Sequence, residues 1–213
     1  MSGPSQRRPG ALVSVVLSGG ASERFLGEPK ALLPVGRETA VGRMVRLSQR
    51  LGVDRVVVVA GLHLPEVNGA VAGLGAEVVE NPDWRLGRTG SVQVGLRAAG
   101  PEATVLIWPV DHPFVALGTL RSLLAASEVD RLALWLIPTF QGRGGHPVLL
   151  RGRALSMVSE LSASAPLRSL LPVIGPEVRR VAVADPGVLD NVDAPQQYLA
   201  ALDAWASRGG GDG

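Results

Sequence analysis

The sequence predicts an α/β fold, a Rossmann-like three-layer α/β/α sandwich built around a mostly parallel sheet. Runs of apolar, largely β-branched residues at 13–17 and 55–60, and a shorter run at 76–80, alternate with segments of helical periodicity. This alternation favours βαβ units, whose right-handed crossovers produce a parallel sheet. The first run also ends at the glycine pair Gly19-Gly20, and the carboxyl ends of parallel strands are where such sheets bind ligands.

Length and composition favour one domain and exclude several classes of protein. The chain has 213 residues, of which 46% are apolar, and we place one domain at 11–206 between termini at 1–10 and 207–213 that we expect to be disordered. The net charge is only +2 and the basic residues are scattered, so no nucleic-acid surface is predicted. Cysteine is absent, which excludes disulfides, thiolate metal sites and cysteine catalysis.

No membrane segment is predicted, because no stretch approaches the roughly 18 uncharged apolar residues that span a bilayer. Arg7-Arg8 ahead of the apolar residues 11–17 resembles an export signal, but the apolar run is short and no A-x-A cleavage site follows it. We therefore expect a cytoplasmic protein.

The loop after the first predicted strand, residues 18–30, has the composition of an anion-binding site. Gly19 and Gly20 allow a sharp turn that exposes consecutive backbone N–H groups. Arg24 and Lys30 add positive charge, and Lys30 is the only lysine in a chain with 20 arginines. A planar guanidinium and a compact ammonium together suit a triphosphate. Neither GxGxxG nor GxxxxGK[ST] is present, which disfavours an NAD(P) oxidoreductase and a P-loop enzyme.

The rest of the chain continues the alternation of strands and helices. On a predicted helix at 40–51, Arg43, Arg46 and Arg50 share a face that we expect to be solvated. Further helices are predicted at 65–74, from Gly90-Ser91 onward, at 117–127, twice within 152–172, and in a last segment ending at Trp205. Further strands are predicted at 104–110, at 132–138, from His146 to Leu150, and at 178–183.

Polar residues beside the predicted strands are candidates for chemistry. Asp111 follows the strand at 104–110, where a carboxylate could hold Mg²⁺, an ion that prefers hard oxygen ligands. We expect His112, next to a proline, to be a local hydrogen-bonding residue, and His63 to be a surface or loop histidine. Asp193 precedes Pro195 and is predicted to cap the last helix.

Several motifs occur in one order along residues 11–203. The pattern L-[AS]-[AG]-G-x-S-x-R-[MF]-G-x-P-K-x-L-L-P is matched by Leu17, Gly20, Ser22, Arg24, Gly27, Pro29, Lys30, Leu32, Leu33 and Pro34. An N-P-x-W-x-x-G-x-x-x-S-x-x-x-G-L block begins at Asn81, D-x-P at Asp111 and G-x-x-G-H-P-[VA]-[LF] at Gly142. A D-[IV]-D-T-P-E-D-[YL] element at 191–198, directly after Asp190, departs at Asn191, Ala194, Gln196 and Gln197. In these motifs the chain resembles the MobA-like nucleotidyltransferases, although one extra residue between Arg24 and Gly27 predicts a bulge there.

This resemblance implies a fold of the nucleotide-diphospho-sugar transferase type and a catalytic set of Arg24, Lys30 and Asp111. It implies that Asp111 and Asp193 hold Mg²⁺, with Asp190 as the alternative second ligand. It also implies that His146, in the glycine-rich arm at 140–150, faces the acceptor substrate. The implied nucleotide pocket consists of Leu17, Ser18, Gly19, Gly20, Ser22, Lys30, Asn81, Gly87 and Ser91.

Enzymes of this family transfer NMP from an NTP to a phosphate-bearing acceptor and release pyrophosphate. The Pro29-Lys30 pair, the block at 81–96 and the GHP arm resemble the molybdenum cofactor cytidylyltransferase branch, which joins CMP to molybdopterin, and so favour CTP. The Gly19-Gly20 pair is typical of the guanylyltransferase branch, which keeps GTP as an alternative. An alternative of another class is a non-catalytic carrier or chaperone for a molybdenum hydroxylase, which the two retained aspartates disfavour.

Overall fold

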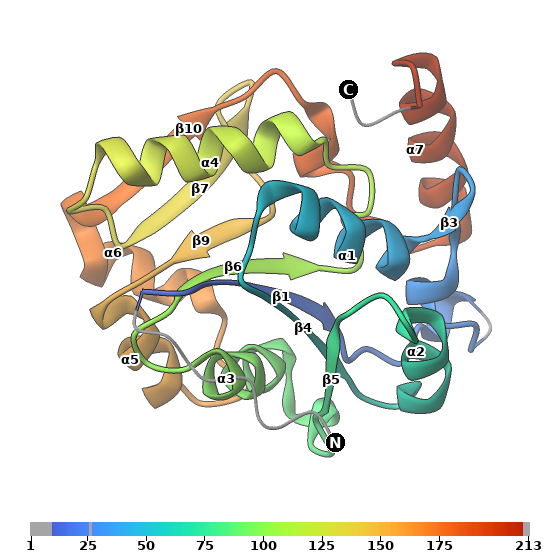
Figure 1. Ribbon diagram of the computed structural model, residues 1–213, viewed down its shortest axis with the longest axis horizontal. Helices are drawn as coiled ribbons and strands as arrows, with labels where there is room; N and C mark the ends of the chain where they lie inside the picture. Colours follow the sequence, from blue (N-terminus) through green and yellow to red (C-terminus); the bar gives the residue numbers. More distant parts are fainter. Residues whose placement is uncertain (1–9, 26, 211–213) are drawn as a thin grey trace.

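The computed structural model describes residues 10–25 and 27–210, and contains a mostly parallel sheet of eight strands (Figure 1). Seven strands lie in the order β10-β7-β9-β6-β1-β4-β5, and β8 pairs with β7. Only β8 and β9 run antiparallel to their neighbours. The strands are β1 Leu12–Ser18, β4 Arg55–Ala60, β5 Glu77–Glu80, β6 Thr104–Pro109, β7 Trp135–Phe140, β8 Arg143–Gly144, β9 Val148–Leu150 and β10 Val178–Ala182. A separate small hairpin pairs β2 (Pro34–Val35) with β3 (Glu38–Thr39).

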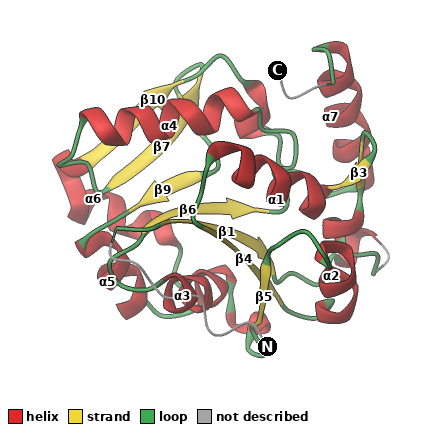
Figure 2. Cartoon of the chain, viewed as in Figure 1, coloured by secondary structure: helices red, strands yellow, loops and turns green. Residues whose placement is uncertain are grey.

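Helices cover both faces of the sheet, which confirms the predicted three-layer architecture (Figure 2). Helices α3 and α5 pack on one face, while α1, α2 and α4 pack on the other. The helices are α1 Ala40–Leu51, α2 Leu64–Val71, α3 Arg88–Ala99, α4 Leu117–Val129, α5 Arg153–Glu160, α6 Leu171–Ile174 and α7 Pro195–Ser207. Among the described residues, none of the helices combines the length and apolar character needed to cross a membrane.

The central strand β1 is buried on both faces, as the apolar run predicts. Val13 and Val15 pack under α3, whereas Val16 faces α1 on the opposite side. Helix α3 approaches β1 closely, because a Cβ on Gly95 would lie 2.3 Å from Val15 Cγ1. This contact packs the middle of α3 on the middle of β1, and the contact between Ser91 and Gly19 places the start of α3 beside the predicted anion loop.

Several predicted boundaries differ from the observed ones. The strand predicted at 132–138 is β7, which begins at Trp135, because Asp130 Oδ1 accepts hydrogen bonds from Leu132 N and Ala133 N and closes a turn there. The strand predicted from His146 begins at Val148, since Pro147 has no N–H to contribute to a ladder. Of the termini predicted to be disordered, 1–10 and 207–213, residues 1–9 and 211–213 lie outside the described residues, whereas Ser207 belongs to α7 and 208–210 form a turn after it.

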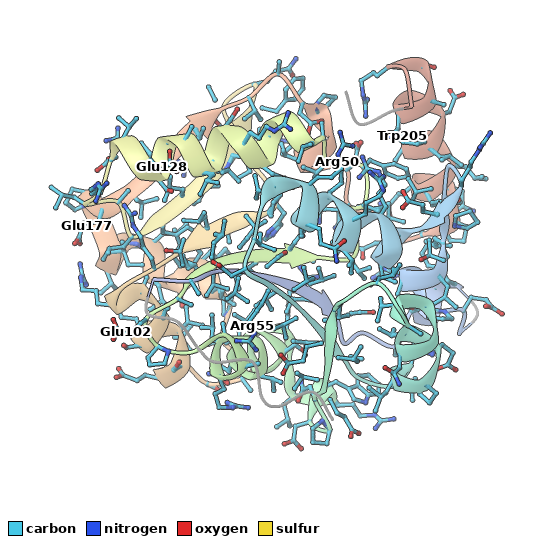
Figure 3. All side chains as sticks on the ribbon, in the orientation of Figure 1. Arg50, Arg55, Glu102, Glu128, Glu177 and Trp205 are labelled. Atoms are coloured by element: carbon cyan, nitrogen blue, oxygen red, sulfur yellow. The ribbon has the colours of Figure 1, made fainter. Side chains whose placement is uncertain are left out.

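The prediction that the arginines of α1 are solvated is wrong for Arg43, which is buried. Arg43 is 1% exposed, and its Nη1 donates to Pro113 O at 2.6 Å and Val115 O at 3.0 Å. Its guanidinium also lies 5.5 Å from the ring centroid of Trp205 on α7, a residue labelled in Figure 3. Arg46 forms a two-bond pair with Glu38, and only Arg50 is exposed. A helical period of three to four residues groups these side chains on one face but does not say what covers that face.

Replacing Arg43 by methionine is expected to lower the free energy of unfolding by about 3 kcal/mol, because two buried carbonyls lose their donor. Arg46→Met serves as a matched control, since its partly exposed pair with Glu38 is worth about 1 kcal/mol or less. Urea unfolding of both variants measures the difference. Equal losses would show that the buried contacts of Arg43 contribute no more than a surface ion pair.

Candidate active site

A cavity of about 520 Å³ opens at the carboxyl ends of β1 and β6. The end of β1 and the loop after it form one wall, and Asp111 after β6 forms another. The start of α3 and the turn before it close a third side. The cavity is lined by Leu17, Ser18, Gly19, Gly20, Ala21, Ser22, Arg24, Pro29, Lys30, His63, Trp84, Arg85, Arg88, Ser91, Pro109, Val110, Asp111 and Asp193.

The glycine loop is shaped by close contacts on both sides. A Cβ on Gly19 would lie 2.7 Å from Ser91 Oγ, so a residue without a side chain is needed for the loop to approach α3. Ser22 adopts a φ of 53° and its Oγ accepts a hydrogen bond from Lys30 N at 3.0 Å. The Ser22 hydroxyl therefore orders the loop and directs Lys30 to the cavity. The bulge predicted between Arg24 and Gly27 falls on Leu26, which lies outside the described residues.

Lys30 and Arg24 both approach Asp193 across the cavity. Lys30 Nζ donates to Asp193 Oδ1 at 2.8 Å, and Arg24 Nη1 lies 4.0 Å from Asp193 Oδ2. Burial raises the pKa of Asp193, but the hydrogen bond and charge of Lys30 outweigh it and hold the pKa below its usual value. The prediction that Asp193 caps the last helix is wrong: the N-cap of α7 is Ala194, with no side-chain bond. The side chain turns instead to the cations of the cavity.

Asp111 is a buried, ionised carboxylate with both oxygens engaged. Its Oδ1 lies 2.8 Å from His112 Nδ1, and its Oδ2 accepts from Arg88 Nη2 at 3.0 Å. Burial raises the pKa of Asp111, but the His112 hydrogen bond and the charges of His112 and Arg88 outweigh it, so the pKa lies well below its usual value. An ionised carboxylate only accepts hydrogen bonds, so His112 Nδ1 carries the proton. His112 is the local hydrogen-bonding residue that its position predicts.

His146 lies behind His112, outside the residues that line the cavity. The two imidazole centroids are 4.8 Å apart in an edge-on arrangement. Burial, followed by the nearby His112, lowers the pKa of His146 to about 3, so its ring is neutral at pH 7. Its Nδ1 is buried without a hydrogen-bond partner in the described part of the chain. In this position the ring packs against His112, the residue that hydrogen-bonds Asp111. A contact between His146 and the acceptor substrate stays a prediction.

The other predicted nucleotide ligands are divided between the cavity wall and the layer behind it. Ser91 lines the cavity, and its Oγ accepts from Asn81 Nδ2 at 3.0 Å. Asn81 Oδ1 also accepts from Asp83 N at 3.2 Å, so both ends of this buried amide have partners within the protein. Gly87 has a φ of 138°, and a Cβ there would lie 2.4 Å from Ala163 O. Asn81 and Gly87 therefore support the wall that presents Ser91.

Among the cavity-lining residues that are missing from the sequence-based set are His63, Trp84, Arg85 and Arg88. Arg85 stacks over Trp84, with its guanidinium 4.2 Å from the ring centroid. Arg88, next to Gly87 and one helical turn before Ser91, shares that residue's side of α3, a signal available in the sequence. His63 is a loop histidine, one of the two predicted alternatives, in the turn before α2; it is not at the surface, since it is 9% exposed and its Nε2 lies 3.3 Å from Ala21 O.

The donor set of the cavity suits a cation that is shared with a substrate. In the described ranges, no group of three or more His, Asp or Glu residues forms a cage for a metal ion. The two carboxylates of Asp111 and Asp193 do face the same cavity, and Mg²⁺ in nucleotide sites commonly uses one or two carboxylates together with substrate phosphates. Asp190 is not among the residues that line the cavity, and its Oδ2 lies 3.7 Å from Arg208 Nη2. Asp193 is thus the better placed of the two aspartates.

Comparisons with curated proteins find partial relatives. The bifunctional protein GlmU of Cellvibrio japonicus is 25% identical over 203 residues, covering 92% of this chain and 45% of GlmU. The molybdenum cofactor guanylyltransferase of Xanthomonas euvesicatoria is 35% identical over 114 residues, covering 54% of each chain. The chain thus spans about half the length of these curated relatives.

Among solved structures, a nucleotidyl transferase from Methanothermobacter thermautotroptrophicus superposes with a TM-score of 0.78 at 26% identity, covering 93% of this chain and 99% of that one. Rv0371c from Mycobacterium tuberculosis has a TM-score of 0.76 at 25% identity, covering 92% and 100%. The family model described as the MobA-like NTP transferase domain matches residues 14–180. With this match over most of its length, the chain belongs to the MobA-like NTP transferase family.

Proposed function

We propose that the protein transfers NMP from an NTP to a phosphate-bearing acceptor and releases pyrophosphate. The observation that carries this proposal is that two ionised carboxylates, Asp111 and Asp193, face the same cavity as a set of cations. The cations that line the cavity are Arg24, Lys30, Arg85 and Arg88. The excess of two positive charges offsets the negative charge that a triphosphate keeps after binding one Mg²⁺.

Positioning and charge neutralisation supply most of the catalysis in phosphoryl and nucleotidyl transfer. The N–H groups of Gly19 and Gly20, with Lys30 and Arg24, are placed to hold the leaving pyrophosphate. Asp111 and Asp193 would hold Mg²⁺, which would neutralise charge on the α-phosphate and orient it. The acceptor phosphate is already ionised at neutral pH, so the chain needs no general base.

For the substrates, we propose CTP and a molybdopterin-type acceptor. The Pro29-Lys30 pair, the block at 81–96 and the GHP arm support the cytidylyl branch. The Gly19-Gly20 pair and the similarity to a molybdenum cofactor guanylyltransferase support GTP as the alternative donor. A non-catalytic carrier for a molybdenum hydroxylase is the second candidate function, and the paired carboxylates favour the enzyme over it.

The test is pyrophosphate release by the purified protein with CTP, GTP, ATP and UTP, each with molybdopterin and with a sugar 1-phosphate. We expect release that requires an acceptor and Mg²⁺, is highest with CTP and molybdopterin, and stops with EDTA. Higher release with GTP would assign the guanylyl branch. Nucleotide binding by calorimetry without pyrophosphate from any pair would instead support the carrier.

A further inference from the structure

Both carboxylates of the cavity already have a cation of the protein as partner. Lys30 Nζ lies 2.8 Å from Asp193 Oδ1, and Arg88 Nη2 lies 3.0 Å from Asp111 Oδ2. The side chain of Asp111 is only 7% exposed, so its charge is costly to leave without a partner. A divalent cation that binds Asp111 therefore meets a guanidinium at the carboxylate.

Asp111 offers a cation only one of its two oxygens. Oδ1 is held by the Nδ1–H of His112 at 2.8 Å inside the protein. His112 is itself 6% exposed and packs against the ring of His146, so this bond lies on the buried side of the carboxylate. Oδ2 is the oxygen on the cavity side, and Arg88 occupies it. Arg88 and a divalent cation therefore compete for the same atom.

The side chain of Arg88 can change position while its backbone stays fixed. Its side chain is 59% exposed, and in the described part of the chain the bond to Asp111 is the hydrogen bond seen for it. The backbone of Arg88 is held in place by the close contacts of Gly87 with Ala163 and of Gly95 with β1. A guanidinium displaced from Asp111 still belongs to a residue that lines the same cavity as Arg24 and Lys30. Phosphate oxygens are the partners that its planar fork suits best.

We propose that Arg88 and the divalent cation exchange places on Asp111 Oδ2. Without nucleotide, Arg88 compensates the buried carboxylate. When the cation arrives with a triphosphate, the cation takes Oδ2 and Arg88 binds phosphate oxygens. The second half of the exchange, in which Arg88 binds phosphate oxygens, rests on the proposed function. The exchange makes the cation and the nucleotide bind cooperatively, because the nucleotide supplies the new partner of Arg88.

The exchange predicts opposite effects of one substitution on two ligands. Arg88→Gln is expected to tighten Mn²⁺ binding about fivefold in the absence of nucleotide, because the competing cation is gone. The same variant is expected to weaken CTP binding in the presence of Mn²⁺ about tenfold, because a phosphate partner is lost. A residue with a purely structural role would weaken both ligands together.

Mn²⁺ titrations followed by electron paramagnetic resonance measure the first effect, and calorimetry with CTP measures the second. Arg85→Gln is the matched control, because it removes the same charge from the same cavity. In the wild type, Arg85 stacks on Trp84 and does not contact Asp111, so the Mn²⁺ affinity of this variant should change less than twofold. Thermal melts check that each variant is folded.

The outcomes separate the exchange from the metal site itself. Unchanged Mn²⁺ affinity in Arg88→Gln, or an equal gain in Arg85→Gln, would overturn the exchange. Unchanged CTP affinity in Arg88→Gln would overturn its second half. Asp111→Asn is expected to abolish the effect of Arg88→Gln, and Mn²⁺ binding that does not depend on Asp111 would overturn the metal site on which the proposed function rests.

Discussion

Asp111→Asn is expected to lower magnesium-dependent pyrophosphate release by about two orders of magnitude or more. Asparagine keeps the shape and one acceptor oxygen for His112, but it removes the charge through which Mg²⁺ holds its ligands. Weak nucleotide binding through Lys30 and the glycine loop should remain. Initial rates over a range of Mg²⁺ concentrations, with thermal melts to verify folding, measure the effect.

Asp190→Asn is the control for this substitution. It removes a nearby aspartate that is not among the cavity-lining residues and is partnered by Arg208. Pyrophosphate release in this variant should stay within about twofold of the wild type, because the carboxylate of Asp190 does not reach the cavity. Wild-type activity in Asp111→Asn would leave the transferase without its metal site, and a large loss in Asp190→Asn would move that site toward Asp190.

Lys30→Ala is expected to lower kcat/KM for the nucleotide by about a hundredfold, because the partly buried ammonium that we propose binds the phosphates is lost. The side chain of Lys30 is 16% exposed, and the chain has no other lysine. The loop itself should keep its shape, since the bond between Ser22 and Lys30 uses the backbone N–H of Lys30. Lys30→Arg should restore only part of the activity, because a planar fork does not fit a site made for a compact ammonium.

Arg37→Ala is a suitable control for the loss of one positive charge. Arg37 is exposed at the turn between β2 and β3 and is not among the residues that line the cavity. Steady-state kinetics with the nucleotide varied at saturating Mg²⁺ compare the three variants. Equal kcat/KM in Lys30→Ala and the wild type would contradict the phosphate-binding role of the loop.

The order of helices and strands followed from local signals in the chain. The runs around Val15 and Val57 are apolar and β-branched, and such runs become strands that are buried on both faces of a parallel sheet. The antiparallel strand β9 between β6 and β7 has only three residues, and its place depends on partners distant in sequence. Its position in the sheet was therefore beyond local pattern analysis.

The positions of the glycine loop and Asp111 were predictable from local signals, because each follows a strong strand signal and the carboxyl ends of parallel strands meet at one edge of the sheet. Lys30 was predictable with them, since it closes the glycine loop. The partners of the charged side chains became known only from the folded arrangement of the chain. Arg43 is buried, Asp193 turns to Lys30 instead of capping α7, and Arg88 holds Asp111. The physical reason is that an ion pair depends on distance and burial between segments far apart in the chain, which neither periodicity nor spacing encodes.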